Sequence, residues 1–119
     1  MKKLFIAAFM LVSSFGTNVM ADGHAIKMGI ILGFTGPIES LTPAMRDSAK
    51  LAFEEASASG SLLGGKKISV LEADSTCVDS AAATAAAEGL ISQGVAAIMG
   101  ADCSGVTGAI ASNVAVPNG

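Results

Sequence analysis

The stretch Val95-Ala-Ala-Ile-Met-Gly-Ala-Asp-Cys-Ser-Gly105 changes from a short apolar run to small and polar residues, and an alanine-rich helical pattern follows it. The apolar run predicts a buried strand, and the pattern after it predicts a helix. Where a helix begins, several backbone N–H groups have no partner within the helix, and a carboxylate can accept hydrogen bonds from them. We therefore expect a ligand at this junction, where Ser104 adds a hydroxyl group.

A first strand and helix open the pattern. The nearly continuous apolar run over 26–33 predicts a strand that is buried on both faces, and a turn-rich loop over 34–41 follows it. Thr42 is the expected N-cap of the next helix and Pro43 its first residue, because proline lacks the N–H that would be unpaired there. Apolar residues at helical spacing then predict an amphipathic helix that ends near Gly60.

A second strand and helix follow a turn that contains two glycines. Residues 67–72 are predicted to form the strand, and Asp79 or Ser80 is predicted to cap a helix that ends at Gly94. With the junction described above, the order is β-α-β-α-β-α. Such alternation is typical of an α/β fold with a parallel sheet and right-handed crossovers, so we expect a three-layer, Rossmann-like lobe.

Three loops are expected to meet at one edge of this sheet, because the carboxyl ends of parallel strands lie together and ligands bind beyond them. These loops are the segments 34–41, 74–79 and 101–107. Cys77 lies in the second loop and Cys103 in the third. A disulfide between them would brace the edge at which the ligand is expected.

The N-terminus has the layout of a secretory signal peptide. A start with two lysines is followed by an apolar run over 4–12 and by small residues up to Ala21. The apolar run is too short to span a bilayer, which needs about 20 residues. We expect cleavage after Ala21, so that residues 1–21 are the signal peptide and residues 22–119 form the exported lobe. The expected location is the periplasm.

Composition limits the partners further. The chain has 10 acidic and 7 basic residues, a formal net charge of −3, and neither tryptophan nor tyrosine. Because the sequence has no basic patch with interleaved aromatic residues, we expect no nucleic acid as a partner. In an oxidising compartment Cys77 and Cys103 are expected to form one disulfide, and the alternatives are two free thiols or a metal pair.

Two segments partly resemble motifs for nucleotide binding or for nucleophilic catalysis, but neither matches its motif. The glycine-rich segment 60–67 approximates a P-loop, but it ends in lysine and precedes a strand. A nucleophilic Ser104 would need glycine where Asp102 stands, and the one histidine, His24, lies by the cleavage site. Asp74 and Asp102 are candidate metal ligands, although carboxylates in such loops more commonly cap helices or accept bonds from backbone N–H groups. We therefore expect no catalytic residue, no metal and no cofactor.

The segments 26–37, 74–77 and 98–104 resemble, in order and spacing, the start of periplasmic substrate-binding proteins of the branched-chain amino-acid type, the solute receptors of ABC importers. The resemblance runs from about Ala25 to Pro117. Family members are longer, with two α/β lobes joined by a hinge and the ligand between them, so the resemblance implies an N-terminal fragment of the first lobe. It also implies an amino acid, or a related small carboxylate or amide, as ligand and ABC permease subunits as membrane partners.

The resemblance implies roles for single residues as well. Ser104 matches the family serine that follows the second cysteine, so its hydroxyl or backbone N–H is expected to bind the α-carboxylate of the ligand. Leu41 matches a position where the family often places a bulky side chain over the ligand. Asp102 and Thr107, in the same junction as Ser104, complete the expected ligand-binding set. The alternative function is an exported ligand-sensing or regulatory module that uses the same fold.

Overall fold

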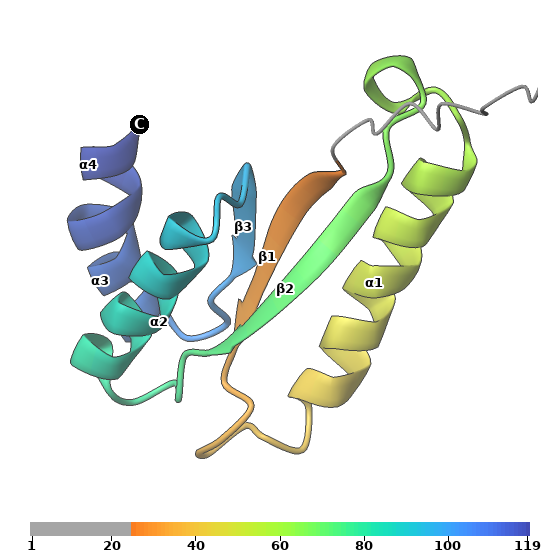
Figure 1. Ribbon diagram of the computed structural model, residues 1–119. Coiled ribbons are helices and arrows are strands. Elements are labelled where there is room, and N and C mark those ends of the chain that lie inside the picture. Colours follow the sequence, from red (N-terminus) through yellow and green to blue (C-terminus); the bar gives the residue numbers. More distant parts are fainter. Residues whose placement is uncertain (1–24) are drawn as a thin grey trace, which may run out of the picture.

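A computed structural model describes residues 25–119, which form a three-stranded sheet with helices on both faces (Figure 1). The strands are β1 (Ile26–Leu32), β2 (Ile68–Asp74) and β3 (Ala97–Gly100). All are parallel, and their order across the sheet is β2-β1-β3. The predicted α/β fold with a parallel sheet is therefore confirmed. The expected signal peptide, with its cleavage after Ala21, lies outside the described residues.

Helices alternate with the strands, and they are α1 (Thr42–Ala58), a short 3-10 turn (Leu62–Gly64), α2 (Ser80–Ser92), α3 (Ser104–Ile110), a wider π-type turn (Ala111–Ala115) and α4 (Val116–Asn118). α1 covers one face of the sheet, while α2 and α3 cover the other, which gives the expected three layers (Figure 1). The chain stays helical from α3 through the π-type turn into α4, so residues 104–118 form one continuous helical segment. Within residues 25–119, no helix is both long enough and apolar enough to cross a membrane.

The three strands end at the same edge of the sheet. Leu32 lies opposite Asp74 in the register of β1 and β2, and Ile31 lies opposite Gly100 in the register of β1 and β3. The loops that follow the strands therefore start side by side, at the lower edge of the sheet in Figure 1. This alignment gathers the loops that the sequence places at a binding edge.

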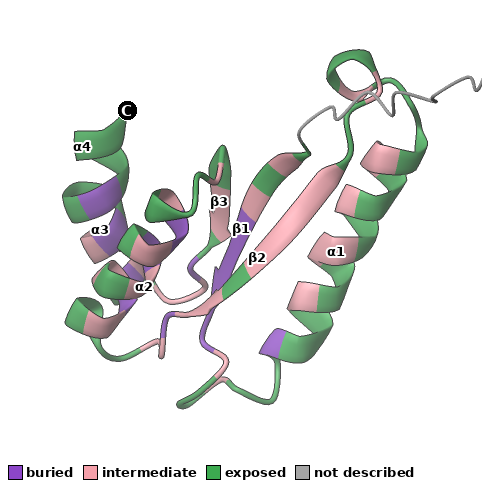
Figure 2. Cartoon of the chain, viewed as in Figure 1, coloured by how far each residue is buried: buried purple, intermediate pink, exposed green. Residues whose placement is uncertain are grey.

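The hydrophobic core lies mainly between the sheet and the layer of α2 and α3. Ile31 and Leu32 of the central strand are at most 1% exposed. Ile31 packs in one cluster with buried residues of the helices and of the turn after β3, namely Ala83, Ala87, Leu90, Ala101, Val106, Ile110 and Val114. Figure 2 shows buried stretches of β1, α2 and α3 in purple, whereas α1 is mostly intermediate or exposed. Leu51 on α1 is 56% exposed. The core thus holds α3, the helix that begins with Ser104, firmly against the sheet.

The start of α2 agrees with the sequence. Asp79 is the N-cap, and its carboxylate accepts hydrogen bonds from the backbone N–H groups of Ala81 (2.9 Å) and Ala82 (3.0 Å). Aspartate is among the best N-cap residues because its side chain satisfies N–H groups that the helix leaves unpaired. Of the two predicted caps, Asp79 is the one that the structure uses.

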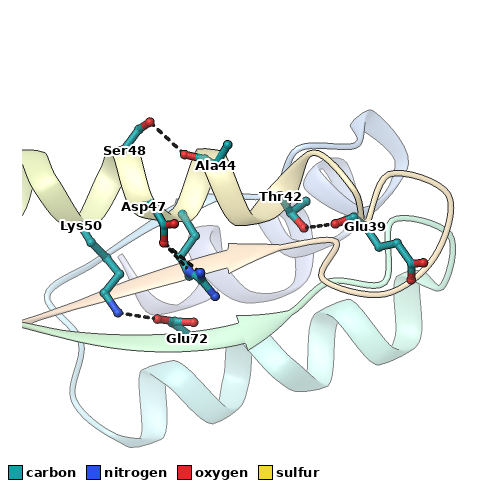
Figure 3. Close-up of polar contacts among 8 residues, drawn as sticks. Glu39, Thr42, Ala44, Asp47, Ser48, Lys50 and Glu72 are labelled. Atoms are coloured by element: carbon teal, nitrogen blue, oxygen red, sulfur yellow. Dashed lines mark hydrogen bonds and ion pairs between the residues drawn. The ribbon is translucent and has the colours of Figure 1, made fainter.

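The predicted N-cap of α1 is wrong. Leu41 occupies that position, Thr42 is the first residue of the helix and Pro43 follows it. Thr42 is fully buried, and its hydroxyl lies 3.3 Å from the carbonyl oxygen of Gly33 and 3.2 Å from that of Glu39 (Figure 3). Both neighbours are acceptors, so the hydroxyl donates a bond to the loop instead of accepting one from the helix. Thr42 therefore ties the start of α1 to the end of β1.

Candidate functional site

The carboxyl edge of the sheet is built from three loops, which are residues 33–41 after β1, 75–79 after β2 and 101–103 after β3. A disulfide between Cys77 and Cys103 joins the second loop to the third, with Cα atoms 5.3 Å apart. The predicted pairing is confirmed, and the alternatives of free thiols or a metal pair are wrong.

Asp74, the last residue of β2, ties the first loop to the second. Its carboxylate accepts bonds from the Thr35 hydroxyl (2.6 Å), the Thr35 N–H (3.3 Å) and the Thr76 N–H (2.8 Å). Burial acts to raise the pKa of Asp74, but the hydrogen bonds from Thr35 and Thr76 favour the charged form more strongly, so its pKa lies below the usual value of an aspartate. The Asp74 carboxylate therefore accepts hydrogen bonds from the two loops. This is the more common of the two roles that the sequence left open for it, the other being metal binding.

Asp102 ties the turn after β3 to the ends of both other strands. Its Oδ2 accepts a bond from the backbone N–H of Gly33 at 2.9 Å, and its Oδ1 lies 3.5 Å from the hydroxyl of Ser75. Gly33 follows β1 directly, and Ser75 follows β2 directly and is fully buried. The acidic candidate of the predicted ligand-binding set thus has protein partners for both of its oxygen atoms.

Glycines allow the loops to approach one another closely. Gly36 has φ +97°, and a Cβ atom built there would lie 2.5 Å from the carbonyl oxygen of Thr76. Gly100 has φ +130°, and its Cβ would lie 1.8 Å from the carbonyl oxygen of Ile31. Any other residue would clash at either position and would also be strained by the positive φ. Glycine at these positions therefore lets the first loop contact the second and lets β3 end against β1.

The start of α3 is open. Ser104 is the first residue of the helix and is exposed, and Cys103 is the N-cap but provides no side-chain hydrogen bond. The Ser104 hydroxyl and the N–H groups of Ser104, Gly105 and Val106 have no hydrogen-bond partner among residues 25–119. Ser104 is therefore not the N-cap of α3. An open helix start of this kind attracts a carboxylate through its N–H groups and its positive dipole end.

The remaining two candidates lie on the same edge with different exposure. The Thr107 hydroxyl faces the carbonyl oxygens of Ala101 and of Cys103, the latter at 2.8 Å, so it stabilises the turn before α3. Leu41, the N-cap of α1, is 61% exposed and presents apolar surface at the end of the first loop. The structure therefore places all four predicted ligand-binding residues at the carboxyl edge, although two of them have bonds within the protein.

Two residues of this edge are missing from the predicted set. Thr35 donates its hydroxyl and N–H to Asp74, and Ser75 directs its hydroxyl toward Asp102. The sequence signal that could have identified them is a residue with a hydroxyl group shortly after β1 and after β2. Only the register of the sheet shows that these residues face the carboxylates of neighbouring loops.

A cavity of about 430 Å³ lies between β3 and the continuous helical segment, and it reaches the third loop at Ala101 and α3 at Thr107. Its lining is mostly apolar and includes Ile31, Ile98, Ile110 and Val114. Within the part of the chain that the structure describes, no three histidine, cysteine, aspartate or glutamate side chains come together as a metal site would need.

Comparison with known proteins agrees with this architecture. A family model described as periplasmic binding protein matches residues 25–118. The chain belongs to the periplasmic binding protein family. A similar solved structure is that of the branched-chain amino acid transporter substrate binding protein LivJ from Streptococcus pneumoniae str. Canada MDR_19A in complex with isoleucine, with 30% sequence identity and a TM-score of 0.67. No curated protein matches the chain.

The match to this periplasmic binding protein covers 77% of the chain and 26% of LivJ. The chain therefore spans about a quarter of the length of that relative. The family match includes all three loops of the carboxyl edge and both cysteines. The resemblance stated from the sequence is confirmed for the family and for the fold.

Proposed function

We propose that this chain is part of an extracytoplasmic solute-binding protein, and that its carboxyl edge binds an amino acid or a related small carboxylate or amide. The observation that carries the proposal is the open start of α3, where N–H groups and the Ser104 hydroxyl have no partner among the described residues. The relative LivJ, a transporter substrate-binding protein in complex with isoleucine, supports this class of ligand.

Binding at this edge follows from ordinary hydrogen-bond chemistry. The ligand carboxylate accepts bonds from the N–H groups at the start of α3 and from the Ser104 hydroxyl. Each hydrogen bond to a charged group contributes about 1.5–3 kcal/mol when water is excluded from it. The positive end of the helix adds to the attraction because residues 104–118 form one continuous helical segment.

The other parts of the ligand are contacted elsewhere. Leu41 offers apolar surface for a ligand side chain at the same edge. In this proposal, protein elements outside residues 25–119 cover the ligand from the opposite side and exclude water. Binding breaks no covalent bond, so the proposal assigns no residue a catalytic role.

The proposed partners are the permease subunits of an ABC transporter, which receive the ligand at the membrane. The proposed location is the periplasm, reached through a signal peptide over residues 1–21 that is cleaved after Ala21. Support for both comes from the family match and from the layout of the N-terminal sequence.

Calorimetric titration of the protein as its gene encodes it tests the proposal. The panel contains isoleucine, leucine and valine, small polar amino acids, and the amides asparagine and glutamine. The expected result is saturable binding of at least one member, with a ligand that lacks the carboxylate bound much more weakly. A protein that unfolds cooperatively but binds no member of the panel would contradict the proposed function.

A further inference from the structure

The carboxylate of Asp102 is placed where the ends of all three strands meet. Asp102 belongs to the turn after β3, and its two oxygen atoms reach Gly33 at the end of β1 and Ser75 at the end of β2. These partners precede it by 69 and 27 positions in the chain. One side chain therefore joins three loops that the sequence keeps far apart.

The two donors that face Asp102 depend on it. Gly33 is buried and Ser75 is fully buried. Among the described residues, the Gly33 N–H and the Ser75 hydroxyl have no hydrogen-bond acceptor other than this carboxylate. A buried donor without a partner is costly, so these groups hold the carboxylate toward the strand ends and not toward a ligand.

Asp102 is also next to the residues that form the open helix start. Cys103, which follows it, is the N-cap of α3 and is fixed by the disulfide to Cys77. Ser104 comes next. Consecutive residues are thus held by a charged hydrogen bond and by a covalent bond, immediately before the N–H groups that the proposed ligand would use.

We infer that Asp102 is a positioning residue for the ligand site: it fixes the start of α3 against the ends of β1 and β2 and does not itself contact the ligand. This inference rests on the proposed function and changes the role of Asp102 from ligand contact to support. Hydrogen bonds weaken steeply as the donor moves or tilts, so a small shift of the helix start lowers affinity for a carboxylate.

Substitutions that separate charge from geometry test the inference, with isoleucine as the probe and the protein as its gene encodes it. Asp102→Ala removes the acceptor and should weaken binding about tenfold, the equivalent of about one lost hydrogen bond. Asp102→Asn keeps an acceptor for the Gly33 N–H, and its amide can donate to Ser75, so its affinity should stay within about twofold of the parent. Asp102→Glu keeps the charge but displaces it, and it should weaken binding as Asp102→Ala does.

A direct contact between Asp102 and the ligand gives the opposite pattern. In that case Asp102→Asn loses as much affinity as Asp102→Ala, because both remove the charge, and Asp102→Glu retains most of it. That pattern would overturn the inference, as would unchanged affinity in Asp102→Ala. The Asn and Glu variants decide the question if the Ala variant does not fold, and the urea midpoint of each variant shows that a change in affinity is not a loss of fold.

Amide hydrogen exchange gives a measurement that needs no ligand. Asp102→Ala should speed exchange at Gly33 and in the first turn of α3, while Asp102→Asn should retain the protection of the parent. If the parent protein binds neither isoleucine nor any other member of the panel, the proposed function fails, and the exchange data still decide whether Asp102 holds the turn. Unchanged protection of the Gly33 amide in Asp102→Ala would show that it does not.

Discussion

Ser80 and Ser104 stand at the same position, the first residue of a helix, yet only the helix of Ser80 has a side-chain cap. Asp79 accepts bonds from N–H groups at the start of α2, whereas the N-cap of α3 is Cys103, whose sulfur is used in a disulfide. Both serines are exposed. Ser104 therefore lies beside helix N–H groups that have no acceptor among the described residues. Ser80 occupies the matched position in α2, where Asp79 accepts bonds from such groups.

The matched serines give the first prediction. Ser104→Ala should weaken binding of the best ligand by about 10- to 100-fold, because a hydrogen bond to a charged group is lost. Ser80→Ala, with the same change at the capped helix, should leave the affinity within about twofold. Titration calorimetry measures both, and thermal melts check that the fold is intact. Equal affinities for the two variants would show that the Ser104 hydroxyl does not bind the ligand.

The disulfide gives a prediction about stability. Cys77 and Cys103 are 26 positions apart, and closing a loop of that length stabilises the folded chain by about 3–4 kcal/mol in the chain-entropy description. The double variant Cys77→Ser, Cys103→Ser should lose about that much free energy of unfolding in urea titrations. Reduction of the parent protein should produce a similar loss. Identical midpoints for the oxidised and reduced parent would contradict this prediction.

Asp74 gives a prediction about pH. Its pKa in the folded protein lies below the usual value, because the bonds from Thr35 and Thr76 outweigh the effect of burial. The charged form therefore stabilises the fold fully above about pH 4, and this contribution is lost as the pH falls through the lowered pKa. The free energy of unfolding should fall more steeply on acidification in the parent than in Asp74→Asn. If the free energy of unfolding had the same pH dependence in the parent and in Asp74→Asn, the prediction for Asp74 would be wrong.

The core gives a prediction that contrasts two leucines. Leu90 is 1% exposed and packs in the cluster with Ile31, whereas Leu51 on α1 is 56% exposed. Leu90→Ala should lower the free energy of unfolding by about 2–5 kcal/mol, through lost burial and the cavity that remains. Leu51→Ala should change it by about 0.5 kcal/mol or less. Similar losses of unfolding free energy for the two variants in urea titrations would contradict this prediction, because α1 would then contribute as much to the core as α2.

Export gives a prediction that mass spectrometry decides. Protein recovered from the periplasm should begin at Asp22 and should contain no thiol that reacts with an alkylating reagent before reduction. After reduction, Cys77 and Cys103 should both react. A mature N-terminus far from Asp22 would contradict the expected signal peptide, and alkylation without reductant would contradict the disulfide.

Local patterns were sufficient to predict the elements of this fold. The apolar run at β1 and the helical spacing in α1 depend on neighbouring residues, and the structure has a strand and a helix there. The cap of α2 was predicted as Asp79 or Ser80, and the structure uses Asp79, whose partners are the N–H groups of the residues just after it. The N-cap of α1 was misplaced by one residue, because Thr42 faces the carbonyl oxygen of Gly33, a contact that the local pattern does not contain.

The hydrogen bonds that join the loops of the candidate site could not be predicted from the sequence. The bond from Gly33 to Asp102 joins positions 69 residues apart, and the partners become known only when the order and register of the strands are known. The same holds for Thr35 and Asp74. The position of Ser104 at a helix start was predictable, but the partners of the carboxylates around it were not.

The central place of β1 has a consequence for how the chain is made. β1 is the first strand of the described residues to leave the ribosome, yet it pairs on one side with β2 and on the other with β3, through contacts such as Ile26 with Ile68 and Met28 with Ala97. A nascent chain that has reached only α1 contains no partner for it. Folding that depends on such distant pairs has a high contact order and is slow. β1 therefore has no strand partner until residues 68–74 have been synthesised, and both of its neighbours are present only after residue 100.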